Sequence, residues 1–507
     1  MPEYLYPGVY VEEVDTGNKP IEGVSTSTVG FLGIAERGPE QPTFITSFSD
    51  FVRYYGRYLR DASGTPTAYL AYSVEGFFQN GGKRCYVSRV FASGATKGAA
   101  THNGLKVDAI GPGSWSGRLY YAIVTNPNSA NLFTLQLFYY AVAPAVAPAT
   151  VADINPREVQ HSEVFEDLSI DPTSANFYER RVNFVSTLIT VSQVSAAAPG
   201  NVALAAFPAG SDAGTPVLND FLGQPPVAPG QNRGLLALEE VEDISLLCCP
   251  DEWFFNNNAI AVALRDQAER LRYRFAILGS PQNPGALPFN PSVQGSKYAA
   301  FYYPWLHIID GATGKVVQVP PTGHVAGIYA RTDTERGVHK APANATVNGI
   351  DSLVANLNNQ QQAALNPIGV NVIRYFRGSG NLVWGARTVS SDPDWKYVNV
   401  RRLFIFVEKS IERGTQWVVF EPNDTATWAR VRRSVSDFLT RLWMDGMLQG
   451  TSKEQAFFVK CDRTTMTQAD IDNGRLICLV GIAPVKPAEF VIFRIGQWTG
   501  GSEVTEQ

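Results

Sequence analysis

A strand–helix–strand pattern near the middle of the chain restricts the fold more than any other feature. Residues 243–249 and 275–279 are short apolar runs, and residues 259–272 between them have the composition of a helix. Two strands joined through a helix of this length pair side by side by running in the same direction. The pattern therefore predicts a βαβ unit, and with it a parallel or mixed sheet that carries helices on its faces.

A second α/β pattern lies earlier in the chain. Apolar runs at residues 27–35 and 85–90 predict two strands. Thr65-Pro66 predicts the start of the helix between them, because threonine caps a helix and proline fits its first turn. Residues 21–90 are therefore expected to form the first part of the same α/β core, whose second part is 236–367.

The stretch between these two parts, residues 91–235, has a different composition. It is rich in Ala, Gly, Pro, Ser and Thr, and short alternating runs such as 119–125 and 133–141 are scattered through it. Such runs, separated by long loops, are typical of short antiparallel strands. We expect an inserted, β-rich surface domain at 91–235.

A C-terminal α+β domain is expected at 368–483. Its runs 456–461 and 476–482 predict strands, whereas 399–412 fits a strand or a helix. A helix at 427–447 has the clearest periodicity in the chain. Its apolar stripe consists of Trp428, Val431, Val435, Phe438 and Leu442.

The opposite side of this helix carries a charged ridge of Arg430, Arg433, Asp437 and Arg441. Two interpretations stay open for the ridge. It is either a solvated face whose charges pair with one another, or a docking face for an acidic partner surface.

Both ends of the chain have the pattern of interior strands, with apolar residues on both faces. An end strand of this kind either completes a sheet of its own chain or pairs with a sheet of a neighbouring molecule. We expect an arm at 1–20 and a second arm at 484–507. The strand residues in question are Tyr4, Tyr6, Val9, Tyr10, Val11 and Glu12 at one end, and Phe490, Val491, Ile492, Phe493 and Ile495 at the other.

Composition excludes several classes of protein. A chain of 507 residues predicts several domains, and its net charge of −5 without a basic block argues against nucleic-acid binding. The sequence has no signal peptide and no apolar run long enough to insert into a membrane, so we expect synthesis in the cytoplasm. Five cysteines without CxxC spacing are expected to be buried free thiols.

No catalytic, cofactor or metal motif is present in the sequence. Residues 311–315 have the glycines and lysine of a phosphate loop but lack its first glycine and its hydroxyl residue. The region around His307, His324 and His339 leaves one alternative open, a metal-dependent enzyme, although the histidines lack ligand spacing. We expect no enzyme activity, no cofactor and no metal.

Several longer blocks resemble the tail sheath proteins of contractile phages and phage-derived contractile injection systems. The resemblance covers nearly the whole chain and is weakest in 91–235. The blocks that carry it are 296–305 (SKYAAFYYPW), 319–331 (VPPTGHVAGIYAR), 336–344 (RGVHKAPAN), 6–13 (YPGVYVEE), 366–371 (NPIGVN), 384–387 (WGAR), and 400–402 leading to 421–423.

The resemblance implies a mixed α/β multidomain subunit that polymerises as a helical stack of rings, expected to be hexameric. It implies that both arms add strands to the C-terminal domains of adjacent subunits. It also implies an inner tube protein, baseplate proteins and terminator proteins as partners, with the helix at 427–447 facing the tube.

The function that the resemblance implies is contraction, which drives the tube through a target envelope as part of a virion tail or a phage-tail-like particle. A static shell or baseplate protein is the alternative. The sequence does not distinguish a phage tail from an injection system.

Overall fold

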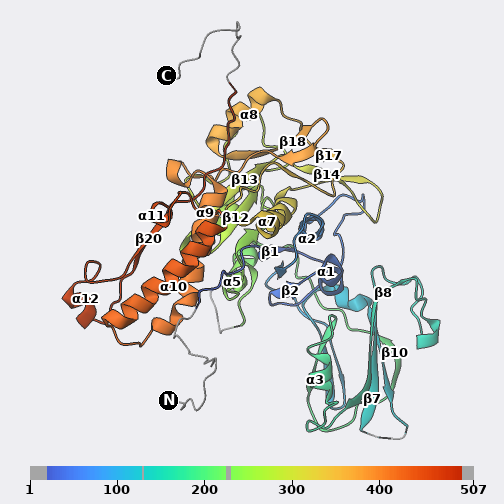
Figure 1. The fold of residues 1–507 in the computed structure, drawn as a ribbon. Helices are drawn as coiled ribbons and strands as arrows, with labels where there is room; N and C mark the ends of the chain where they lie inside the picture. Colours follow the sequence, from blue (N-terminus) through green and yellow to red (C-terminus); the bar gives the residue numbers. More distant parts are fainter. Residues whose placement is uncertain (1–19, 128, 130, 224–229, 494–507) are drawn as a thin grey trace, which may run out of the picture.

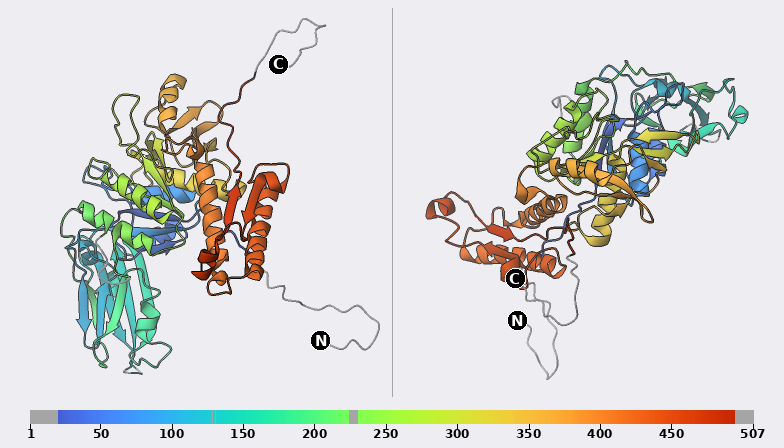
Figure 2. Two further views of the ribbon diagram at one scale, coloured as in Figure 1. Left: turned by 90° about the vertical axis from the view of Figure 1, so that its left-hand side faces the viewer. Right: turned by 90° about the horizontal axis from the view of Figure 1, so that it is seen from above.

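The computed structural model describes residues 20–493 except 128, 130 and 224–229. The predicted strand residues Tyr4–Glu12 and Ile495 lie outside the described residues. Figures 1 and 2 show a central α/β core, a β-rich lobe coloured cyan to green, and an orange-to-red module formed by the C-terminal part of the chain. The mixed α/β multidomain class predicted from the sequence is confirmed.

The core is built around a nine-stranded sheet with the strand order β16-β19-β18-β13-β12-β11-β1-β3-β2. The strands from β18 to β3 are parallel to one another, and antiparallel strands extend the sheet at both edges. The bounds are β1 Val29–Ile34, β2 Thr43–Ile45, β3 Cys85–Val90, β11 Leu246–Cys248, β12 Phe275–Gly279, β13 Ala299–Tyr303, β16 Ala345–Thr346, β18 Val370–Phe376 and β19 Gly380–Val383.

Helices pack on this sheet in two groups. Helix α2 packs on α1 and α7, whereas α6 packs on α4 and on the strands β11 and β12. Because β11 and β12 are parallel and α6 connects them, the predicted βαβ unit is confirmed. The bounds are α1 Phe48–Tyr55, α2 Leu70–Gln79, α4 Leu218–Leu222, α5 Gly234–Glu239, α6 Ala259–Leu271, α7 Thr322–Arg336 and α8 Asn359–Leu365.

Helices α2 and α7 approach each other so closely that glycine is required at several contact positions. A Cβ atom at Gly323 of α7 would lie 2.3 Å from the backbone oxygen of Ser73 in α2. The predicted helix start at Thr65 is wrong, because Pro66 instead forms a bridge with Arg60 and α2 begins only at Leu70. A small three-stranded sheet beside the core contains β14 Leu306–Ile309, β15 Val316–Val319 and β17 Ser352–Leu353.

The strands β4 to β10, termed the insert, form two antiparallel sheets around a core of their own. Strand β7 alternates between buried and partly exposed side chains, which is the pattern of a sheet with one face on a core. The bounds are β4 Ala99–His102, β5 Leu105–Ala109, β6 Leu119–Thr125, β7 Leu132–Tyr140, β8 Val159–Ser169, β9 Ile189–Gln193 and β10 Val202–Ala206, with helix α3 at Tyr178–Val182.

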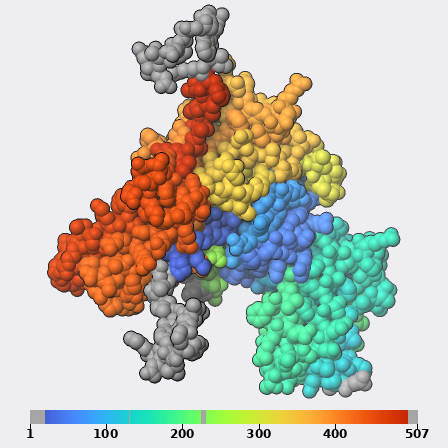
Figure 3. Space-filling model, viewed as in Figure 1, coloured from blue at the N-terminus to red at the C-terminus, as the bar shows by residue number. Residues whose placement is uncertain are grey.

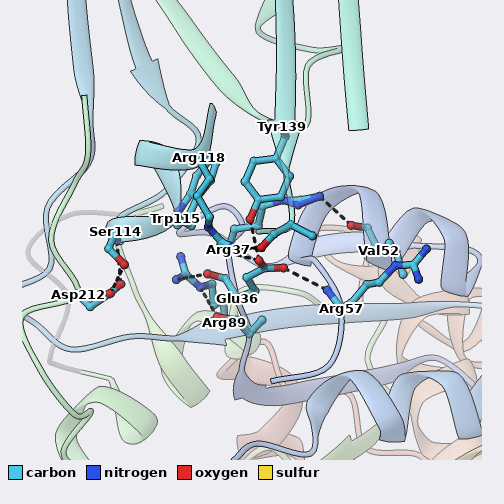
Figure 4. Close-up of polar contacts among 12 residues, drawn as sticks. Glu36, Arg37, Val52, Arg57, Arg89, Ser114, Trp115, Arg118, Tyr139 and Asp212 are labelled. Carbon is cyan, nitrogen blue, oxygen red and sulfur yellow. Dashed lines mark hydrogen bonds and ion pairs between the residues drawn. The ribbon is translucent and has the colours of Figure 1, made fainter. Parts of the chain in front are cut away.

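A buried polar cluster attaches the insert to the core sheet (Figure 4). Glu36 follows β1, and its carboxylate accepts hydrogen bonds from Arg118 (2.7 Å) and from the hydroxyl of Tyr139 (2.7 Å), both in the insert. The guanidinium of Arg37 lies 4.3 Å from the centre of the Tyr139 ring. Arg89 of β3 donates a hydrogen bond to the carbonyl of Pro112 (2.8 Å). These contacts fix how the insert projects from the carboxyl edge of β1 and β3.

The third part, termed the C-terminal module, comprises residues 398–485. Its helices α9 and α10 share a separate apolar core with the hairpin of β20 and β21. The predicted stripe from Trp428 to Leu442 is buried there, and the ambiguous stretch 399–412 is helical. The bounds are α9 Val398–Gly414, α10 Thr425–Met444, α11 Lys453–Ala456, β20 Phe457–Lys460, α12 Gln468–Asp472 and β21 Leu479–Ile482.

Some residues near the predicted domain limits pack with a different part of the molecule than the sequence predicts. Strands β18 and β19 belong to the core sheet, although they follow residue 368. Phe221 and Leu235, near the end of the stretch 91–235, pack in the core as well. The domain limits themselves remain predictions.

No helix within the described ranges is both long enough and apolar enough to cross a bilayer.

Candidate functional site: open hairpin edges and the roots of two arms

The β20–β21 hairpin has two outer edges that no other strand covers in the described part of the chain. Four residue pairs form its ladder, from Phe457 opposite Ile482 to Lys460 opposite Leu479. Each outer edge of a two-stranded sheet leaves a row of backbone groups without a strand partner. The hairpin is therefore able to accept a further strand at either edge.

The two faces of the hairpin differ. Phe457 and Val459 point towards α10 and pack against the core of the C-terminal module. Phe458 points outward, and its side chain is 52% exposed. Its ring lies over Gly481 on the paired strand, where a Cβ atom would lie 2.2 Å from the ring. One face is thus anchored, while the other is available for contact.

An apolar groove runs beside β21. Its volume is about 760 Å³, and it opens between the end of α9, α10 and the strand. Its apolar lining includes Ile411, Val418, Val431, Val435, Leu476 and Val480. A groove of this kind next to a free strand edge offers a place for side chains of an added strand.

The first residues that the structure describes are held in the C-terminal module. We term residues 21–26 the N-terminal root. Ile21 is buried in the module's core, and its carbonyl accepts a hydrogen bond from Arg441 (2.6 Å). Gly414, at the end of α9, leaves room for it, because a Cβ atom there would lie 2.8 Å from the Ile21 side chain. The amide of Val24 donates to the hydroxyl of Ser410 on α9 (3.1 Å). The described part of the chain therefore begins at a fixed point.

A buried ion pair secures the next residues of this root. Arg402 of α9 donates to Asp333 of α7 (2.9 Å) and to the carbonyl of Thr26 (2.8 Å), and the Thr26 hydroxyl donates to Asp333 (2.6 Å). Both charged side chains are 4% exposed. Burial disfavours the Arg402 cation, but the charge of Asp333 outweighs burial and raises its pKa. The pair joins the core, the C-terminal module and the N-terminal root.

Glu489 attaches the C-terminal segment to the body of the molecule, and we term it the C-terminal root. Its carboxylate accepts two hydrogen bonds from Arg387 (2.7 and 2.8 Å) and one each from Asn366 (2.9 Å) and Tyr397 (2.9 Å), and it pairs with Lys396 (3.1 Å). Burial opposes its ionisation, but the hydrogen bonds, that of Arg387 foremost, lower the pKa of Glu489 to about 2.

Beyond Glu489 the chain leaves the body of the molecule. The four side chains Phe490, Val491, Ile492 and Phe493 are between 70% and 82% exposed. In Figure 3 the dark red segment that leads to them runs from the C-terminal module along the core to the far end of the molecule. These residues form no strand in the single chain. Their assignment as a strand for a neighbour stays a prediction.

Replacing Glu489 with Gln should loosen this root. The substitution keeps the shape of the side chain but leaves Arg387 and Lys396 without their counter-charge, at a cost of about 2 kcal/mol for charge-assisted hydrogen bonds. Hydrogen exchange of residues 485–489 should then become roughly 30-fold faster at pH 7, since 1.36 kcal/mol is a factor of ten. Lys486→Gln, in the same segment but exposed, should leave the exchange unchanged. Equal exchange in both variants would contradict the anchoring role.

The same anchor predicts a dependence on pH. A carboxyl group whose pKa is lowered on folding stabilises the folded state above its ordinary pKa of 4.5, and this contribution is lost as the pH falls towards 2. Exchange at 485–489, corrected for the intrinsic rate, should therefore rise as the pH falls through this interval. The Gln variant should lack this rise.

The charged ridge of α10 is only partly available for contact with a partner, because two of its arginines are engaged within the chain. Arg430 pairs with Glu421 (3.0 Å), and Arg441 is engaged with Ile21, as described above. The side chains of Arg430, Arg433, Asp437 and Arg441 are all exposed to some degree on one side of the helix. Whether the ridge faces a partner stays a prediction.

The structure does not bring the three histidines together. His307 contacts Ser352 (3.0 Å) and Gln318, whereas His324 is buried against Gly76 between α2 and α7. Burial lowers the pKa of His324 to about 4, so the ring is neutral at pH 7. His339 lies elsewhere, with burial lowering its pKa. The described residues contain no group of three or more His, Cys, Asp or Glu side chains placed to hold a metal.

Sequence reasoning missed the anchoring residues. Glu489 was part of the predicted arm but had no assigned partner, and its partners come from positions 366 to 397. A single acidic residue directly before an apolar run was the only local signal for this anchor. Ile21 offered none.

Two family models match consecutive parts of the chain. The model described as the phage tail sheath protein central domain matches residues 228–389. The model described as the phage tail sheath C-terminal domain matches residues 390–497. Together they cover more than half of the 507 residues.

Individual relatives agree with the family models. A tail sheath protein of Burkholderia phage BcepMu is 24% identical over 477 residues, which is 88% of each chain. A prophage protein of Pseudomonas aeruginosa described as a major tail sheath protein is 29% identical over 49% of this chain, and the match spans 62% of that relative's length. The helical sheath of the anti-feeding prophage, solved in its contracted state, is 25% identical with a TM-score of 0.59, over 97% of this chain and 99% of that one.

Proposed function

This chain belongs to the phage tail sheath family, and from that membership we propose that it is the subunit of a contractile sheath in a phage tail or a phage-tail-like particle. The observation that carries the proposal is the β20–β21 hairpin with both outer edges uncovered within the described residues, in a chain whose apolar segment Phe490–Phe493 projects from the body. The family predicted from the sequence is confirmed by the two family models.

The arms form the joints between subunits in this proposal. A strand donated by a neighbour's residues 490–495 pairs with one edge of the hairpin, and a second strand from a neighbour's residues 4–14 pairs with the other. Main-chain hydrogen bonds supply the joint, and alternate side chains enter the apolar groove beside β21. The anchored roots at Ile21 and Glu489 support this role, because a joint is useful only where each arm is firmly attached to its own subunit.

The subunits stack as a helical polymer of rings, which we expect to be hexameric, around an inner tube protein. Baseplate and terminator proteins bound the polymer at its ends. We assign the tube-facing side to the ridge of α10, where Arg430 and Arg433 offer exposed positive charge. Exposed ion pairs contribute about 1 kcal/mol or less each, so such contacts release easily.

Contraction follows from rearrangement of folded subunits, without an enzymatic step in this chain. The extended polymer is held by its partners and shortens into a wider lattice that buries more surface between subunits. The arms keep neighbours linked while their bodies rotate. The tube is thereby driven through a target envelope.

Electron microscopy of the purified full chain tests the proposal. We expect helical tubes to form, and particles assembled with their tube and baseplate to show two lengths, the shorter of larger diameter. A single invariant lattice would favour the alternative of a static shell or baseplate protein. A monomer at all concentrations would contradict both.

A further inference from the structure

Two cysteines stand opposite each other where the β20–β21 ladder ends. The last pair joins Lys460 with Leu479, so the next step in the same register places Cys461 opposite Cys478. Directly opposed residues of antiparallel strands have Cα atoms about 4.5 or 5.5 Å apart. Both distances fall within the range of about 4.4–6.8 Å that a disulfide spans.

The side chains also point the same way. Alternation along β20 places Phe457, Val459 and Cys461 on the side that packs against α10, and the partner position Cys478 lies on this side too. The two thiols are near enough to shift each other's pKa, upward for Cys461 and downward for Cys478. The remaining cysteines lie at the strands β3 and β11 of the core sheet, away from this hairpin.

The pair differs in exposure and acidity. Cys461 is 1% exposed, whereas Cys478 is half-buried and lines the apolar groove beside β21. The neighbouring Cys461 thiol lowers the pKa of Cys478, and the charge of Arg432 acts in the same direction. The accessible cysteine is therefore the one that more readily forms the thiolate, which is the reactive form.

We propose that Cys461 and Cys478 are a redox modification site, at which a small-molecule disulfide such as oxidised glutathione converts the thiol pair into a reversible cross-strand disulfide. The Cys478 thiolate attacks one sulfur of the oxidant and expels one glutathione thiolate. The Cys461 thiol then loses its proton and attacks the Cys478 sulfur, and the second glutathione leaves as a thiolate. The protein loses two electrons and two protons, and the oxidant ends as two glutathione thiols.

The bond would close the loop 462–477, which contains α12, at the open end of the hairpin. Because both sulfurs lie on the side that faces α10, the outer edges of β20 and β21 stay free, although Cys478 lines the apolar groove beside β21. Oxidation therefore stabilises the hairpin and leaves the backbone groups along both outer edges accessible. The inference concerns the hairpin alone and does not depend on the proposed function.

The test exposes the folded full chain, purified in reductant, to oxidised glutathione and then counts free thiols after denaturation. We expect the five thiols of the chain to fall to three, with a loss of two hydrogen atoms in mass and one cross-linked pair of peptides containing Cys461 and Cys478. The temperature of unfolding of the C-terminal module should rise by several degrees and return when reductant is added.

Three variants make the result specific. Cys461→Ser should form no internal bond and instead carry glutathione on Cys478, and Cys478→Ser should leave the buried Cys461 unmodified. Cys85→Ser, which removes a buried thiol in β3, should lose two thiols as the unmodified chain does. The proposal is overturned if the folded chain keeps five thiols, if glutathione remains on Cys478 of the unmodified chain without an internal bond, or if Cys461→Ser still forms one.

Discussion

A chain that ends at Glu489 should fold and stay soluble but form no tubes. The deletion removes Phe490–Phe493, whose side chains are at least 70% exposed, and leaves the root at Glu489 in place. Burial of a large apolar side chain contributes about 1.5–3 kcal/mol, so two side chains on one face of a donated strand contribute roughly 3–6 kcal/mol to each joint. Sedimentation velocity and electron microscopy should show single subunits at concentrations where the full chain polymerises.

A matched control removes equally exposed apolar side chains elsewhere. Val142 and Val146 in the insert are 80% and 83% exposed, and the double replacement by Ser should leave polymerisation intact. Deletion of residues 1–19, which keeps Ile21 in its buried position, should abolish tubes as the C-terminal deletion does. Ordered tubes from either deletion would show that the arms are not the joints.

Asp333→Asn should cause a large loss of stability in the C-terminal module. It leaves the Arg402 guanidinium buried without a counter-charge, and breaking one side of a buried pair costs about 3–5 kcal/mol. The free energy of unfolding of the module should fall by this amount, because the pair joins α9 to α7 and to Thr26. Denaturant unfolding followed by tryptophan fluorescence measures the change.

An exposed pair provides the comparison. Asp243 and Arg413 are 4.0 Å apart with side chains 62% and 67% exposed, so Asp243→Asn should change the unfolding free energy by about 1 kcal/mol or less. Similar losses in the two variants would mean that the Asp333–Arg402 contact does not join the parts.

Elements with a local signal were predictable from the sequence. The run 275–279 forms β12, and the stripe from Trp428 to Leu442 forms the buried side of α10. Both depend on the spacing of neighbouring residues, which a sequence displays directly. The family was predictable for a different reason, because long blocks of residues resemble known sheath proteins.

Features that depend on distant residues were not predictable. Helix α2 begins later than the sequence predicts, because Tyr69 donates its amide to Asp251, a residue 182 positions later in the chain. The local pattern of residues 399–412 is ambiguous, and their packing with α10 makes them helical. The binding site of Glu489 is assembled from Asn366, Arg387, Lys396 and Tyr397, and no short window contains both sides of that contact.

Helix α9 lies between the residues that hold Ile21 and those that hold Glu489, so its length sets the distance between these two anchoring points. Lys396 and Tyr397, which hold Glu489, come directly before the helix, and Gly414 at its other end makes room for Ile21. With 17 residues at 1.5 Å each, the helix is about 25 Å long. A force applied at one anchoring point is thus transmitted to the other through α9 alone and not through the whole chain between them. In the proposed polymer, each subunit would then keep a constant distance between its two joints, and the lattice would change shape through the angles between subunits.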